Sequence, residues 1–345
     1  MAVIDHEFKS EFNDKYSLVS RKIVRMLSED SRVTVSDMAK SIKISRQSIV
    51  ERLGRLNQEL GLRYTLELNE DALGLSDPHL ILVTFTKKPD YDYIKRIFEK
   101  SHIPQLVAIF KNGYDMLIYA NATSRQEYVH WDKSMQILLS DYGVSWKASE
   151  VAHRQLGFFP IRNELIDRLK LAPKYKEMIK LLNSNSRASF QELSKKLGMH
   201  FNTVAYNFKK LEGMGYIKRF TVMMEQQEKI CFMSNFGKYV ISRSFEEDAA
   251  RERKALMSDD ENAIVSRYIL CCQLVGSYDF FSVGAFDSLK VALKHDIAYY
   301  KKAMANEKPK MEFGEIERVL VGRLPVRSLE AKKVFDTIKW TPDKE

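Results

Sequence analysis

The sequence predicts an α+β protein in which a winged helix-turn-helix and a ferredoxin-like (βαββαβ) unit occur twice in tandem. Three observations support this prediction. The chain contains a long internal repeat. Each copy has a third helix whose apolar residues recur on one face. Each copy then continues with segments in the order expected of a βαββαβ unit.

The repeat is clearest at Ser31-Arg32, which recurs as Ser186-Arg187, 155 residues further along the chain. The correspondence runs without a gap from Ile23/Met178 to Leu56/Leu211 and keeps apolar residues aligned with apolar ones. A repeat of this length implies two equivalent structural units. We therefore expect the chain to divide near residue 165.

The composition fits a globular protein with a partner of negative charge. The 345 residues include 45% hydrophobic residues and carry a formal net charge of +9. Such a balance favours a polyanion, because Lys and Arg release counterions from phosphates. No stretch approaches the roughly 20 apolar residues of a membrane helix, and Met1 to Tyr16 does not read as a secretory signal. We expect a cytoplasmic protein with no membrane partner.

Cysteine usage gives no sign of a metal site. The chain has only Cys231, Cys271 and Cys272, and no CxxC pair. We expect buried, reduced thiols rather than a disulfide framework or a structural zinc site. No cofactor is implied.

The first helix-turn-helix has its helices at Val19 to Leu27, at Ser36 to Ser41 and after Ser45, which can cap the third helix. On that third helix Ile49, Leu53 and Leu56 form one buried face. The residues expected to face DNA are Ser45, Arg46, Gln47, Ser48, Arg52 and Arg55. Arginine and glutamine at the start of such a helix can reach guanine and adenine edges.

The second helix-turn-helix runs from Ala188 to Glu212 and buries Val204, Phe208 and Leu211. Its predicted outer face consists of Phe201, Asn202, Thr203, Tyr206, Asn207 and Lys210. The two aromatic residues either touch thymine methyls and sugars or pack on another chain. The general alternative for both copies is a helical hairpin with a solvated charged face.

A β-wing is expected after each third helix, at residues 62–68 and 217–222. Basic residues open both segments. The residues assigned to contacts with the duplex backbone are Arg52, Arg55, Arg63, Lys218 and Arg219.

Further segments predict the βαββαβ unit. In the first copy, strands are expected at 80–85, 106–110, 116–120 and 144–151, and helices at 90–100 and 124–139, with a hairpin at Asn112-Gly113. The second copy repeats the hairpin at 270–283, followed by a helix at 286–303 and a strand near 316–321. About seven extra residues are expected around 245–263.

These assignments divide the chain into six parts. They are a first winged helix-turn-helix at 17–70, a first ferredoxin-like unit at 78–152, a connector at 153–171, a second winged helix-turn-helix at 172–225, a second ferredoxin-like unit at 229–323, and a C-terminal helix and tail at 324–345.

The ordered motifs resemble the Lrp/AsnC (leucine-responsive, feast/famine) family of transcriptional regulators. The resemblance lies in Ser31-Arg32, Ile44-Ser45, Ser48-Ile49, Leu73-Gly74 and Gly113-Tyr-Asp115, and again in Ser186-Arg187, Thr203-Val204, Gly215 to Ile217 and Gly276 to Asp279. His200 departs from the family pattern, because it replaces the Ser that opens the recognition helix.

The resemblance implies double-stranded DNA as a partner and a small amino-acid effector bound by the sensing units. It places the effector at Gly113, Tyr114, Asp115, Gly276, Tyr278 and Asp279. An alternative is that these residues only shape a turn and a dimer contact. Family members commonly carry one copy and dimerise through the sensing unit. With two copies fused, we expect either an intrachain pseudo-dimer or a homo-oligomer.

Because the two outer faces differ in almost every residue, we hypothesise that they read two different half-sites. One alternative is a weakly specific architectural DNA-binding protein, which would show a steep salt dependence. A tetrapyrrole decarboxylase on the same fold is a further alternative. Such an enzyme needs basic and histidine residues in a cleft of the sensing unit, whereas His102, His130, His153 and His295 are scattered along this chain.

Overall fold

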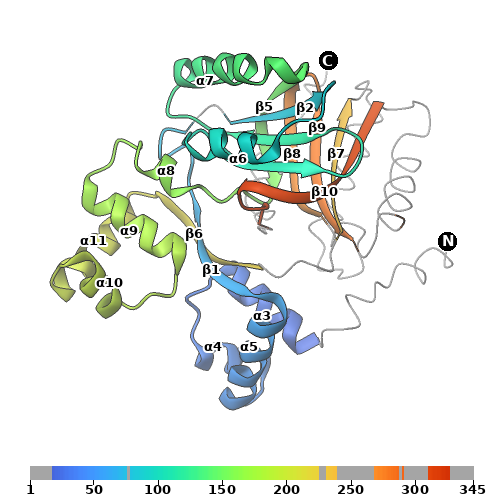
Figure 1. Cartoon of the computed structure of the whole chain (residues 1–345). Coiled ribbons are helices and arrows are strands. Elements are labelled where there is room, and N and C mark those ends of the chain that lie inside the picture. Colours follow the sequence, from blue (N-terminus) through green and yellow to red (C-terminus); the bar gives the residue numbers. More distant parts are fainter. Residues whose placement is uncertain are drawn as a thin grey trace, which may run out of the picture.

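The computed structural model describes residues 18–75, 78–224, 231–238, 268–286, 290 and 310–326. Two helical units lie on different sides of a two-stranded ribbon, and a large closed sheet lies beyond it (Figure 1). The insertion at 245–263 and most of the residues of the helix expected at 286–303 and of the C-terminal helix and tail at 324–345 fall outside this part of the chain. Within the described residues, no helix has the length and apolar content needed to cross a bilayer.

The first helical unit, which we call head 1, comprises α3 (Leu18–Glu29), α4 (Val35–Ile42) and α5 (Arg46–Leu60). The side chain of Thr34 caps α4, and Lys43 ends it in the left-handed conformation with a φ of 63°. Ser45 caps α5 by accepting a hydrogen bond from Ser48 N, as the sequence predicted. The fully buried side chains of head 1 include Ile23, Leu27, Met38 and Ile49.

The second helical unit, head 2, comprises α9 (Pro173–Ser184), α10 (Phe190–Leu197) and α11 (Phe201–Gly213). Ser189 and Glu192 form a capping box at the start of α10. The Nδ1 atom of His200 caps α11 by accepting from Asn202 N, 3.3 Å away. Head 2 also packs against the short helix α8 (Asn163–Ile166), whose Leu165 and Ile166 are buried in the same core.

The segments expected to form two separate wings instead pair with each other. Strand β1 (Leu62–Leu68) lies antiparallel to β6 (Ile217–Met224), with Thr65 opposite Thr221. The prediction of extended segments was right, but the prediction of a wing within each copy was wrong. Most of β1 is buried, so its ladder is satisfied by a partner strand rather than exposed to solvent. We call this pair of strands the ribbon.

The first ferredoxin-like unit has the expected order. It contains β2 (His79–Phe85), α6 (Tyr91–Glu99), β3 (Pro104–Phe110), β4 (Met116–Ala120), α7 (Arg125–Leu138), a 3₁₀ turn (Ser140–Tyr142) and β5 (Val144–Leu156). Asp90 and Ser124 cap the two helices. Strand β5 continues five residues beyond the predicted end, into the connector.

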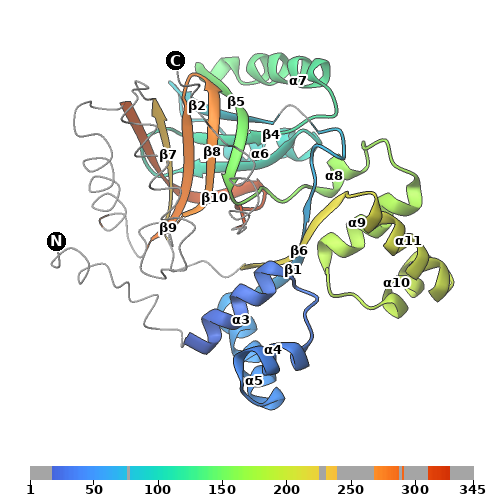
Figure 2. The same ribbon diagram turned by 180° about the vertical axis from the view of Figure 1, so that it is seen from behind.

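The second unit contributes strands β7 (Cys231–Lys238), β8 (Tyr268–Gly276), β9 (Phe280–Phe286) and β10 (Lys310–Gly322). The eight strands form one closed sheet in the order β10-β3-β4-β2-β5-β8-β9-β7. Two junctions join the copies, because β5 pairs with β8 and β3 pairs with β10. Each sheet edge of one copy is thereby paired with an edge of the other (Figure 2).

Two cores stabilise the sheet. Side chains inside the closed sheet, including Tyr119, Phe281, Leu270 and Cys272, come from both copies. On the outer side, α6 and α7 cover β2, β3 and β4 through Phe98, Trp131 and Met135 (Figures 1 and 2). Cys271 and Cys272 are both buried, in agreement with the expected environment of these thiols.

Gly113 makes a close approach across the β3–β10 junction. Its φ is +86°, and a Cβ at this position would lie 2.0 Å from the carbonyl oxygen of Phe313 on β10. Gly74 has a similar φ of +74°, but nothing lies within 4 Å of a Cβ built there. Alanine at Gly74 would meet only the strain of a left-handed backbone, whereas alanine at Gly113 would meet that strain and a steric clash as well.

We expect Gly113→Ala to destabilise the protein more than Gly74→Ala. Both variants pay about 1–2 kcal/mol for a left-handed alanine, and Gly113→Ala adds the cost of overpacking, about 1–3 kcal/mol. Thermal unfolding followed by circular dichroism measures the difference. Equal melting temperatures for the two variants would contradict the packing of the β3–β10 junction.

Candidate nucleic-acid interface and its link to the sheet

The start of α5 presents an exposed polar face. Ser45, Arg46 and Gln47 are exposed, and Ser48 is half-buried beside them. The amide of Gln47 donates to Glu51 Oε1, 3.1 Å away on the next turn. This contact holds the glutamine along the helix, so reading a base would require it to exchange that partner.

Three further arginines extend the positive surface of head 1. Arg55 on α5 and Arg63 on β1 are exposed, whereas Arg52 is half-buried. The structure therefore brings the predicted head 1 residues to one helix and the strand that follows it.

The outer face of α11 is more aromatic than that of α5. Phe201 is 48% exposed and Tyr206 is 65% exposed. Asn202, Thr203 and Lys210 are also exposed. Five of the six residues predicted for this face are thus accessible.

Asn207 is the exception. It is 1% exposed and points into head 2, where its Nδ2 lies 4.0 Å from the sulfur of Met199. Its predicted outward orientation was wrong, because it lies three residues after Val204 and one before Phe208, on the buried side of α11.

Lys218 and Arg219 have a partner within the protein that the prediction did not include. Both approach the buried carboxylate of Glu67 on β1, with N···O distances of 3.5 and 3.4 Å. The side chain of Arg219 is only 13% exposed. Two of the five basic residues that we assign to the duplex backbone therefore also contact a carboxylate within the ribbon.

The residues predicted to bind an effector lie at the two junctions of the closed sheet. Gly113 meets β10, and Tyr114 is buried with its ring centroid 4.5 Å from that of Phe110. Asp115 Oδ2 accepts from Phe85 N at 2.7 Å.

The second set of predicted effector residues occupies the β5–β8 junction. A Cβ on Gly276 would lie 3.2 Å from Ala148 O, and Tyr278 N donates to Ser149 Oγ. Burial raises the pKa of Tyr278, and its hydrogen bond with Glu312 adds to the rise. Asp279 N donates to Gly237 O. Each set thus contacts the other copy or a neighbouring strand.

A buried charged network links the ribbon to the sheet, and no local sequence pattern predicts it. Glu70, in the turn after β1, is 4% exposed. It accepts hydrogen bonds from Tyr119 Oη at 3.0 Å, from Asn121 Nδ2 at 2.7 Å and from Arg154 Nη1 at 2.5 Å. Nothing in its local pattern distinguishes Glu70 from a solvated acidic residue in a turn.

The protonation states in this network follow from burial and from the ion pair. Burial raises the pKa of Tyr119, and the charge of Glu70 adds to the rise. Burial likewise raises the pKa of the Cys272 thiol. Burial alone lowers the pKa of Arg154, but Glu70 outweighs it and the net shift is upward. The centre is an ion pair surrounded by neutral groups.

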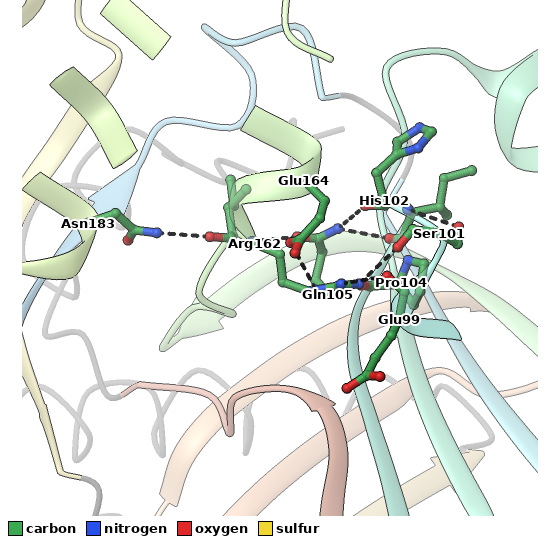
Figure 3. A network of polar contacts seen from close by, with 10 residues as sticks. Glu99, Ser101, His102, Pro104, Gln105, Arg162, Glu164 and Asn183 are labelled. Atoms are coloured by element: carbon green, nitrogen blue, oxygen red, sulfur yellow. Dashed lines mark hydrogen bonds and ion pairs between the residues drawn. The ribbon is translucent and has the colours of Figure 1, made fainter. Parts of the chain in front are cut away.

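The connector forms a second link, which Figure 3 shows in detail. Arg162 donates from Nη1 to Ser101 O and Pro104 O at 3.0 and 2.8 Å, just beyond the end of α6. Its backbone N donates to Gln105 Oε1 at 2.8 Å. One residue earlier, Ile161 O accepts from Asn183 Nδ2 on α9. Head 2 is thereby fixed to the first ferredoxin-like unit.

Three of the histidines considered in the sequence analysis lie in a loop, on a helix and on a strand. His102 pairs with Glu127 at 2.6 Å, His130 is exposed on α7, and His153 lies on β5. His295 falls outside the described residues. In the described part of the chain, no group of three or more His, Cys, Asp or Glu side chains is arranged to hold a metal ion.

The geometry defines a protein with two helix-turn-helix units, and the comparisons agree. The family described as winged helix-turn-helix DNA-binding matches residues 176–218. An uncharacterized HTH-type transcriptional regulator of Pyrococcus furiosus is 28% identical over 136 residues, 39% of this chain and 88% of the relative. The regulator LrpC of Bacillus subtilis is 31% identical over 83 residues, 24% of this chain and 56% of the relative. These relatives support the resemblance to Lrp/AsnC regulators that the ordered motifs indicate.

A structural comparison covers nearly the whole chain. The crystal structure of the siroheme decarboxylase NirDL matches 91% of this chain and 95% of its own, with a TM-score of 0.56 and 13% sequence identity. At this identity the match shows a shared fold. It agrees with the predicted tandem α+β architecture.

We expect Glu70→Gln to destabilise the protein by about 3 kcal/mol, because it leaves Arg154 without its buried countercharge. Urea unfolding followed by circular dichroism measures this loss. Glu164→Gln is the matched control. Glu164 is 54% exposed and pairs with Arg162 at 3.4 Å, so its loss costs less than about 1 kcal/mol. Equal losses for the two variants would show that Glu70 does not form the network described.

Proposed function

We propose that the protein is a sequence-specific DNA-binding transcriptional regulator in which a single chain supplies both reading heads. The observation that carries the proposal is the pairing of β1 with β6, which joins two capped recognition helices within one polypeptide. The matched helix-turn-helix family and the two regulator relatives support the same function.

The two heads differ in the chemistry that they offer to a duplex. Head 1 presents arginines and an amide, which suit guanine and adenine edges. Head 2 presents Phe201, Tyr206 and small polar residues, which suit thymine methyls and sugars. Each chain therefore reads two unlike half-sites and prefers an asymmetric operator.

Selection of DNA sequences by the intact protein, followed by footprinting, tests this proposal. We expect Arg46→Ala with Gln47→Ala to lose one half of the selected motif. Asn202→Ala with Lys210→Ala loses the other half. Truncating a good base contact costs about 1–3 kcal/mol, which is visible as a lost half-site.

Lys133→Ala, an exposed change on α7 in the ferredoxin-like unit, is the control and keeps both halves. A footprint with two identical inverted half-sites would refute the proposal that the two heads recognise different half-sites. Similar affinity for unrelated duplexes with a steep salt dependence would instead support the architectural alternative.

We further propose that a small amino-acid-like effector modulates the protein through the two junctions. Gly113, Tyr114 and Asp115 border one junction, and Gly276, Tyr278 and Asp279 border the other, so a ligand there would act on the contact between the copies. The tetrapyrrole-modifying enzyme remains the alternative, on fold likeness alone.

We expect one of the twenty amino acids to raise the melting temperature, because a ligand at 100 times its Kd stabilises the folded state by about 2.7 kcal/mol. A thermal-shift panel measures this effect, and iron uroporphyrin is added as a separate arm. No shift with any amino acid would refute the effector. A shift with the porphyrin alone would favour the enzyme alternative.

A further inference from the structure

The repeated Ser-Arg pair brings the two heads face to face. Ser31 Oγ and Ser186 Oγ are both buried and lie 2.6 Å apart. Arg32 Nη1 donates to Ser186 O at 2.7 Å, and Arg187 Nη2 donates to Val33 O at 3.3 Å. Each arginine therefore crosses into the other head, which is the reciprocal pattern of a two-fold interface.

The two arginines make unequal contacts with the opposite heads. The guanidinium carbon of Arg32 lies 5.8, 5.0 and 5.5 Å from the ring centroids of Phe190, Phe208 and Phe220. In the described part of the chain, Arg187 lies over one ring, that of Tyr64, at 5.1 Å. In head 1, Val35 and Leu53 stand where head 2 has Phe190 and Phe208. In the described part of the chain, Arg32 therefore makes cation–π contacts with three rings, whereas Arg187 makes one.

The three rings lead directly to the recognition helix of head 2. Phe208 is 5% exposed on α11 and packs against Phe190 at 5.1 Å and Phe220 at 5.7 Å between centroids. Phe190 also contacts Phe201 at 5.9 Å. Phe201 begins α11 and is half exposed on the predicted reading face.

We propose that Arg32 of head 1 is a positioning residue for the recognition helix of head 2. It fixes α11 relative to α5, and so determines which bases the second head reaches. The inference rests on the proposed function, because it assigns a role in reading the second half-site. Arg32 acts through the phenylalanine rings and does not itself contact DNA.

Hydrogen exchange of the intact, DNA-free protein tests the positioning directly. We expect Arg32→Leu to speed the exchange of the α11 amides by about tenfold, which corresponds to the loss of the cation–π interaction of Arg32. Arg187→Leu, the repeat-related control, leaves α11 exchange close to that of the wild type. Arg32→Lys keeps a cation over the rings and restores most of the protection. Unchanged α11 exchange in Arg32→Leu would overturn the inference.

Footprinting on the selected operator separates this role from a general structural one. We expect Arg32→Leu to weaken protection of the half-site that Asn202→Ala with Lys210→Ala loses, and to keep the other half. The salt dependence stays that of the wild type, since no phosphate contact is removed. Equal loss of both half-sites, or a shallower salt slope, would contradict the role. A wild-type protein without a two-part footprint would refute the proposed function, while hydrogen exchange still decides the role of Arg32.

Discussion

The pairing of β1 with β6 is the interaction on which the rest of the structure depends. The two strands come from different copies of the repeat, and Thr65 faces Thr221 near the centre of the ribbon. Thr65 Oγ1 donates to Asn183 O at the end of α9, and Thr221 Oγ1 donates to Ser28 O near the end of α3. Each threonine thus ties the ribbon to the first helix of the opposite head.

The ribbon and the closed sheet each connect the first copy of the repeat to the second. Both join copy to copy through antiparallel strands, and the sheet closes because β5 pairs with β8 and β3 with β10. A closed sheet leaves no unpaired edge to recruit another chain. The Glu70–Arg154 ion pair and the Arg162 contacts then fix the heads to this sheet, so that a change at a junction has a physical route to the recognition helices.

Local patterns predicted the helices and most of the strands of the described chain well. The apolar spacing of Ile49, Leu53 and Leu56 and the cap at Ser45 are local features, and α5 lies where they indicated. The partner of β1 was not predictable in the same way, because alternation along a strand does not identify its neighbour. The wing assignment failed for this reason. Lys218 and Arg219 contact Glu67 within the ribbon, and their contact with the duplex backbone stays a prediction.

The site was predicted less completely than the fold. The prediction that Asn207 faces outward rests on its polarity. Its position along α11, however, places it on the buried face of the helix. Glu70 and Arg154 are 84 residues apart, and their pairing depends on tertiary structure alone. The Ser31-Arg32 repeat was visible in the sequence, but its role across the two heads appears only once they are in contact.

Oxidation of a Ser31→Cys, Ser186→Cys double variant tests the central claim most directly, namely that one chain pairs its own two heads. The two hydroxyl oxygens lie 2.6 Å apart, within the range that a disulfide can bridge with a small adjustment. The single variants control for Cys231, Cys271 and Cys272. We predict a disulfide within one chain, seen as a monomer with two fewer free thiols than its reduced form. A disulfide-linked dimer, or no bond beyond that of the single variants, would contradict the account.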